Sequence, residues 1–234
     1  MEKLVNYFQG KKVTSILDVG TGSGDFLAVL KDVFPEAKIT GVDTDTESLH
    51  EATKKYPDVS FIEMSALQLE FADYSFDVAS ISMAMHHLPD IQTSLKEMQR
   101  VVKPGGWIIV NELFSDNLNQ AQEVHKMFHH FRSRIDRLTG IYHQESFKKE
   151  QILKMVKSAG IQIQLSFENI TETNLIADEG ELEIRIDKMK QHLERIKNLP
   201  EYDIFKPQIE EFRERALIYG FQPATRVVLV GNKK

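Results

Sequence analysis

Three glycines, Gly20, Gly22 and Gly24, follow a short apolar segment that carries one acid, Asp18. Glycine adopts backbone conformations that other residues avoid, and it leaves bare main chain against which a bulky ligand can lie. A helical pattern of apolar residues begins directly afterwards, at Phe26. A strand, a glycine-rich turn and a helix in this order are typical of the first βα unit of a nucleotide-binding site. The residues therefore predict a cofactor site, and the alternative is a turn that binds nothing.

The spacing of the glycines argues against a dinucleotide cofactor. A dinucleotide fingerprint has glycine at the first, third and sixth places, and the sixth place here is Asp25. Asp18 also stands two residues before the first glycine, where dinucleotide enzymes usually carry an apolar residue. Both residues argue against a nicotinamide-dependent oxidoreductase, which stays open only as an alternative.

A second acid, Asp43, ends the next expected strand, at residues 38–43. Because the carboxyl ends of neighbouring parallel strands meet at one edge of a sheet, Asp43 is expected beside the glycine turn. A carboxylate at that place can accept hydrogen bonds from both hydroxyls of a ribose. Thr44 and Glu47 have the spacing of a capping box, so a helix is expected directly after Asp43.

A polar helix expected at about 117–138 carries candidate residues for an acceptor pocket. One face of this helix is formed by Gln122, His125, His129 and Asp136, at spacings of three, four and seven residues. His143 follows the helix break at Gly140, and Glu112 ends a strand at the ligand-binding edge of the sheet. We expect these groups to line an acceptor pocket and to provide hydrogen bonds or a base; a solvated helix face is the alternative.

Two further histidine patterns have simpler interpretations. His125 and His129 stand four residues apart near a carboxylate, as in some metal sites, but nothing in the sequence fixes the ligand geometry, and no metal is predicted. His86 and His87 follow a strand, and we expect a structural role, with one ring packed against the sheet and the other near solvent.

The elements that position these residues alternate along the first half of the chain. Strands are expected at residues 14–19, 38–43, 59–62, 76–81 and 107–112, with a Lys103–Gly106 turn before the last of them. Strict alternation with helices favours a parallel, helix-covered sheet. A helix at about 146–160, a strand at 161–167, two helices separated at Asn198–Pro200 and a final strand from Thr225 should follow. No linker interrupts the pattern, so residues 1–234 are predicted to form one domain with a helical insertion at about 172–222.

The composition limits the class of protein. The chain has 234 residues, of which 41% are hydrophobic and 27% charged, as in ordinary globular proteins. No apolar run approaches the roughly 20 residues of a membrane span. The absence of cysteine excludes disulfides and thiolate chemistry and favours the cytoplasm. The net charge is −6 with scattered basic residues, so a nucleic-acid partner is not expected.

The order of these motifs resembles the class I S-adenosylmethionine (SAM)-dependent methyltransferases, in the small-molecule branch similar to ubiquinone/menaquinone biosynthesis methyltransferases. The resemblance is carried by Asp18 with the three glycines, Gly41–Asp43, Phe76–Val78, Met85–Leu88 and Lys103–Gly106. It implies an α/β fold with a Rossmann-like, doubly wound, mostly parallel sheet of seven strands and helical insertions. In that fold the last strand is antiparallel and lies between strands five and six.

The resemblance also implies roles for individual residues. S-adenosyl-L-methionine would lie along Gly20, Gly22 and Gly24, with Asp18 at its polar end. The residues that would contact the rest of the cofactor are Asp43 at the ribose, Thr44, Ser65 and Ala66 at the adenine, and Ser82 along the methionine arm. Ser65 stands where the family usually has an acid, and a hydroxyl binds without charge assistance. SAM binding weaker than usual is therefore expected.

The predicted activity is methyl transfer to a small or medium-sized acceptor by in-line displacement. Holding the reacting atoms in line can contribute about 7–11 kcal/mol. The residues after strand four, Ser82–Met85, differ from the Asn/Asp-Pro-Pro-aromatic motif of enzymes that methylate adenine or glutamine nitrogens. A non-catalytic SAM-binding or interaction module stays open as an alternative. The helical insertion could be a lid, a homodimer surface or simple packing, and we favour a cover over the acceptor side.

Overall fold

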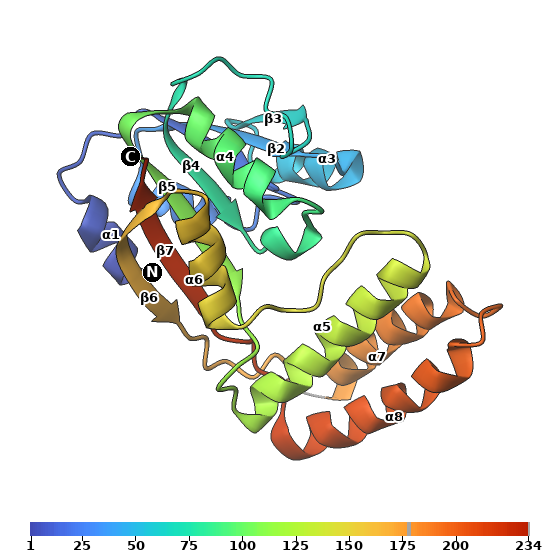
Figure 1. Ribbon diagram of the computed structural model, residues 1–234. Helices are drawn as coiled ribbons and strands as arrows, with labels where there is room; N and C mark the ends of the chain where they lie inside the picture. The colour runs from blue at the N-terminus through green and yellow to red at the C-terminus, as the bar shows by residue number, and fades with distance from the viewer. Residues whose placement is uncertain (177–178, 234) are drawn as a thin grey trace. The chain divides into compact units, whose positions relative to one another are not determined.

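The computed structural model (Figure 1) describes residues 1–176 and 179–233. They form two compact units. The sheet unit comprises residues 1–112 and 150–169 and the segment from 227 onward; the helical unit comprises residues 113–149 and 170–226. The expected helical insertion at about 172–222 includes residues 177 and 178, which lie outside the described residues.

The sheet has seven strands in the order β3-β2-β1-β4-β5-β7-β6. Their bounds are β1 Ser15–Val19, β2 Lys38–Asp43, β3 Ser60–Glu63, β4 Phe76–Ser82, β5 Val102–Leu113, β6 Gln162–Asn169 and β7 Arg226–Asn232. The pairs β1–β2, β1–β4, β2–β3 and β4–β5 are parallel. The predicted doubly wound sheet, with strand order reversing on either side of β1, is confirmed.

Strand β7 runs antiparallel to β5, as the resemblance implied (Figure 1). At one end, the Phe114 amide just after β5 donates to the Thr225 carbonyl just before β7 at 3.1 Å. At the other end, Asn232 Nδ2 in β7 donates to the carbonyl of Gly106 in β5 at 3.0 Å. The start of one strand therefore meets the end of the other.

Helices cover both faces of this sheet. They are α1 Glu2–Phe8, α2 Leu27–Val33, α3 Thr46–Lys55, α4 Ile91–Val101 and α6 Lys149–Ser158, with a 3-10 turn η1 at Met85–His87. Phe8 of α1 and Leu30 of α2 pack in one core with Ile16 and Val228 of the sheet. Helices α4 and α6 lie side by side in Figure 1, and Gln92 Nε2 donates to the Met155 carbonyl at 3.0 Å.

The expected capping box between Thr44 and Glu47 is wrong. Asp45 is the N-cap of α3, and its carboxylate accepts the amides of Glu47 and Ser48. The Asp45 amide itself donates to Asp43 Oδ1 at 3.0 Å. Aspartate caps a helix at least as well as threonine, so this local bond and the stronger cap move the helix start by one residue.

The expected turn at Lys103–Gly106 lies inside β5 rather than before it. Phe76 pairs with Val102 and Val78 pairs with Trp107, so the residues between Val102 and Trp107 bulge out of the β4–β5 ladder. Gly105 has a φ of +77°, which glycine adopts without strain. The strand resumes after the bulge and carries Asn111 and Glu112 to the carboxyl edge.

The helical unit contains α5 Gln120–Leu138, α7 Glu179–Glu194 and α8 Tyr202–Tyr219. Their apolar stripes form a separate core around Phe131, Ile186, Met189 and Phe212, each at most 1% exposed. A capping box between Asn119 and Gln122 begins α5. Among the described helices, none has both the length and the apolar character needed to cross a bilayer.

Replacing Phe212 with alanine tests whether this core sustains the helical unit. Phe212 is fully buried, so the Phe212→Ala change should lower the stability of the unit by about 3–5 kcal/mol. Hydrogen exchange of the amides in α5, α7 and α8 measures the loss. Leu217 on the same helix is 63% exposed, and Leu217→Ala should change stability by no more than about 0.5 kcal/mol. Equal protection in the two variants would contradict this account of the core.

Candidate functional site

The glycine turn presents bare main chain at the end of β1. Gly20, Gly22 and Gly24 have φ values of +66°, +51° and +81°. A Cβ at Gly20 would lie 2.6 Å from Ala84 Cβ, whereas a Cβ at Gly22 would meet no atom within 4 Å. The first glycine is therefore required by close packing, and the second faces open space that a ligand can fill.

Asp43 is joined to this turn, as the sequence predicted. Its Oδ2 accepts the Gly22 amide at 2.8 Å, and its Oδ1 accepts the Asp45 amide at 3.0 Å. The parallel register between β1 and β2 pairs Val19 with Val42, so Asp43 follows at the carboxyl edge. A carboxylate oxygen can accept more than one hydrogen bond. Asp43 can therefore hold the turn and accept ribose hydroxyls together.

Asp18 lies below the turn and is 1% exposed. Its Oδ1 accepts the Ser80 hydroxyl of the neighbouring strand β4 at 2.7 Å. Burial raises the pKa of Asp18 to about 6, although the hydrogen bond from Ser80 opposes the shift. Sequence reasoning missed Ser80, whose signal was a lone hydroxyl within the buried run Val78–Ile81.

A second polar pair lies at the ends of β4 and β5. Asn111 Nδ2 donates to Ser82 Oγ at 2.8 Å, and the Met83 amide donates to the Asn111 carbonyl at 2.8 Å. Asn111 is 1% exposed, and its Oδ1 accepts no hydrogen bond from the described residues. A buried amide oxygen without a donor fits a site that a polar ligand completes. Sequence reasoning missed Asn111, a polar residue that ends an apolar run.

The remaining residues expected at the adenine follow β2 and β3. Thr44 is exposed directly after Asp43, Ser65 is exposed and Ala66 is buried. The Met64 amide donates to the Asp43 carbonyl at 2.8 Å, which brings the segment after β3 beside the end of β2. Ser65 Oγ accepts the Leu67 amide at 3.2 Å and so also shapes its own turn.

Glu112 is fully buried in the sheet unit. Its Oε2 accepts the Met85 amide at 2.9 Å, and its Oε1 lies 3.0 Å from His86 Nδ1. These bonds hold the 3-10 turn after β4. His86 is 3% exposed and His87 is exposed, which matches the expected division between a packed and a solvated ring.

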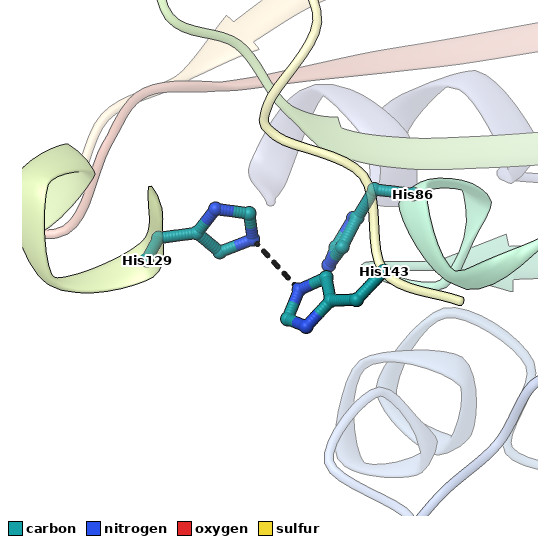
Figure 2. A group of neighbouring side chains, drawn as sticks. All are labelled: His86, His129 and His143. Atoms are coloured by element: carbon teal, nitrogen blue, oxygen red, sulfur yellow. Dashed lines mark hydrogen bonds between the residues drawn. The ribbon is translucent and has the colours of Figure 1, made fainter. Parts of the chain in front are cut away.

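In the helical unit, His129 and His143 lie together, as Figure 2 shows. Their Nε2 atoms are 3.4 Å apart. His143 is 2% exposed, and its Nδ1 lies 2.7 Å from Asp136 Oδ2. Arg195 Nη1 donates to the other oxygen of Asp136 at 2.5 Å. Burial alone would raise the pKa of Asp136, but hydrogen bonds from His143 and Arg195 outweigh it and hold that pKa well below its usual range.

His125 stands apart from this group. Its ring packs against Phe221, with centroids 5.2 Å apart. Burial, together with the charges of Arg185 and Arg226, lowers the pKa of His125 to about 4, so the ring is neutral at physiological pH. Gln122, from the same expected face, donates to Thr225 Oγ1 at 2.9 Å. Of the predicted face, the structure joins only His129 and Asp136 to His143.

Comparisons with known proteins agree with the cofactor edge described above. A family model described as a methyltransferase domain matches residues 17–110. A demethylmenaquinone methyltransferase from Chlorobaculum parvum is 30% identical over 181 residues, which cover 72% of this chain and 74% of the relative.

Two solved structures share the fold. The YcgJ protein from Bacillus subtilis has a TM-score of 0.63 at 17% identity, with 100% of this chain and 97% of that chain covered. A SAM-dependent methyltransferase from Methanosarcina mazei has a TM-score of 0.62 at 16% identity, with 98% and 96% covered. The glycine turn, the sheet order and the relatives thus agree, and the alternative of a nicotinamide-dependent oxidoreductase finds no support among them. This chain belongs to the class I SAM-dependent methyltransferases and is similar to the enzymes of quinone biosynthesis.

Proposed function

We propose that this enzyme methylates a small-molecule acceptor of the quinone class, such as the demethylmenaquinone for which its relative is named. The similarity to that relative over most of both chains is the observation that carries the proposal. The test is incubation with methyl-labelled SAM and demethylmenaquinone, in oxidised and reduced form, followed by mass spectrometry. We expect a product in which one labelled methyl group has replaced one hydrogen of the quinone. Bound SAM without any quinone product would contradict this acceptor class.

When bound, SAM would supply the methyl group that its sulfonium sulfur carries. We assign Asp43 to the ribose hydroxyls, Asp18 to the ammonium end and Ser82 to the methionine arm. Ser82 is oriented by its hydrogen bond from Asn111. Thr44, Ser65 and Ala66 are assigned to the adenine. The open space above Gly22 supports this placement, because a cofactor there would touch main chain only.

On the acceptor side, we assign His143 as hydrogen-bond acceptor or base, with His129 beside it. The low pKa of Asp136 keeps its carboxylate ionised, so the proton between them belongs on His143 Nδ1. His143 Nε2 is then the basic nitrogen, as a hydroxyl acceptor requires. Neutral His125 can donate or accept a hydrogen bond. Glu112 would act indirectly, by holding the Met85 amide and the His86 ring.

The partner class, the compartment and the role of α8 are inferred from composition and from exposed side chains. A net charge of −6 and scattered basic residues support a small molecule rather than a nucleic acid as partner. The absence of cysteine supports the cytoplasm. Ile204, Leu217 and Ile218 on α8 are 66%, 63% and 71% exposed, which supports a lid or a homodimer contact through α7 and α8.

Asp43→Ala should weaken SAM binding at least tenfold while the fold survives. The change removes two charged hydrogen bonds to ribose, each worth about 1.5–3 kcal/mol, and also frees the Gly22 amide. Calorimetry measures the affinity. Asp25→Ala is the matched control, because the Asp25 side chain is 89% exposed in the same turn. An Asp43 variant that binds as tightly as the Asp25 variant would refute the ribose assignment.

SAM affinity should fall as the pH drops below the raised pKa of Asp18, about 6. The cofactor's ammonium group favours the ionised carboxylate, so at lower pH binding must first release a proton. The dissociation constant should be flat above about pH 7 and rise up to tenfold per pH unit below the pKa. Asp18→Asn should bind more weakly and lose this pH dependence. An unaltered pH profile in Asp18→Asn would show that another group titrates.

His129→Ala and His143→Ala should lower kcat far more than they weaken SAM binding. General base catalysis contributes typically 10²–10⁴-fold, so His143→Ala should fall in that range with a hydroxyl acceptor. Turnover with demethylmenaquinone and calorimetry with SAM separate the two effects. His50→Ala, exposed on α3, is the control. Full turnover in both histidine variants would remove this pair from the acceptor site.

A further inference from the structure

The contact between His129 and His143 has a length that a shared ion explains well. Their Nε2 atoms are 3.4 Å apart. Direct hydrogen bonds from ring nitrogens are shorter, at about 2.7–3.2 Å. Two nitrogens bound to one tetrahedral ion at about 2.0–2.1 Å each lie about 3.3–3.4 Å apart. We propose that His129 Nε2 and His143 Nε2 bind one divalent transition-metal ion of the zinc type. With the ion bound, His143 Nε2 would not be available as a base, and a water held by the ion would take that role.

The hydrogen bonds behind His143 are those expected of a metal ligand. Its Nδ1 lies 2.7 Å from Asp136 Oδ2, which leaves the lone pair on Nε2, the atom nearest His129 (Figure 2). A carboxylate that fixes the tautomer and orientation of a ligating histidine recurs in zinc sites, and it makes the ring a better donor. His143 is 2% exposed, so its orientation is set before an ion arrives.

The carboxylate is itself held in place. Arg195 Nη1 donates to Asp136 Oδ1 at 2.5 Å, and Arg195 Nη2 donates to Thr139 Oγ1 at 2.5 Å. The positive charge of Arg195 would repel a nearby metal ion, and the negative charge of the Asp136 carboxylate offsets this repulsion. Two neutral imidazoles leave coordination positions for water or another oxygen ligand, which suits zinc, cobalt or nickel better than calcium or magnesium.

Cobalt titration tests the site without SAM or an acceptor. The full chain, prepared without a histidine tag and treated with a chelator, is titrated with Co²⁺ and then with Zn²⁺. We expect visible cobalt absorption bands that saturate at one ion per chain and disappear when zinc displaces cobalt. Absence of these bands would overturn the proposal, whatever the outcome of the methyl-transfer assay.

Variants connect the bands to the proposed ligands. His129→Gln and His143→Gln should each abolish them, and His50→Gln, exposed on α3, should leave them unchanged. Asp136→Asn should weaken binding about 10–100-fold, because the histidine loses its orienting carboxylate. Circular dichroism checks the fold, and if His143→Gln unfolds, His129→Gln decides. Unchanged cobalt binding in a folded His129→Gln would contradict the site.

Discussion

The hydrogen bond from the Gly22 amide to the Asp43 carboxylate is the constraint on which the cofactor edge depends. It joins the end of β2 to a turn whose three glycines, Gly20, Gly22 and Gly24, all have positive φ. Because strands β1 and β2 are parallel and in register, the bond forms only when both strands end at the same level. Correct pairing of the sheet and correct shape of the cofactor turn are therefore one requirement.

Two buried aspartates, Asp18 and Asp136, have pKa values shifted in opposite directions. Asp18 accepts a hydrogen bond from the Ser80 hydroxyl, but burial dominates, so the pKa of Asp18 rises. Asp136 receives a ring N–H and a guanidinium, which outweigh burial, so its pKa falls. The first carboxylate is poised to gain from a cationic ligand. The second is already compensated and serves to orient His143.

Local patterns made much of the sheet unit predictable. The glycine spacing, the acid at the end of β2 and the alternation of strands and helices depend on residues close in sequence. Ser80 and Asn111 were missed because their partners, Asp18 and Ser82, come from other strands. The cap of α3 was misjudged because Thr44 and Asp45 are both good caps, and the bond from the Asp45 amide to Asp43 decides between them.

The histidine face was predictable only in part. Helical periodicity placed His129 and Asp136 together, but it also included Gln122 and His125, which bond and pack elsewhere. His143 follows the turn at Gly140, where φ is +83°, and Arg195, directly after α7, holds the Asp136 carboxylate that His143 contacts. Helical periodicity concerns residues of α5 alone, whereas the site also needs His143 and Arg195 from other segments.

The place of β7 has a consequence for how the protein is made. This strand, Arg226–Asn232, is the last of the seven strands of the sheet to be synthesised, yet it lies between β5 and β6. Until it arrives, β5 and β6 expose unpaired edges that other chains can join. Such late, long-range pairing folds slowly. Helices α7 and α8 are therefore synthesised before the strand that completes the pairing of β5 and β6.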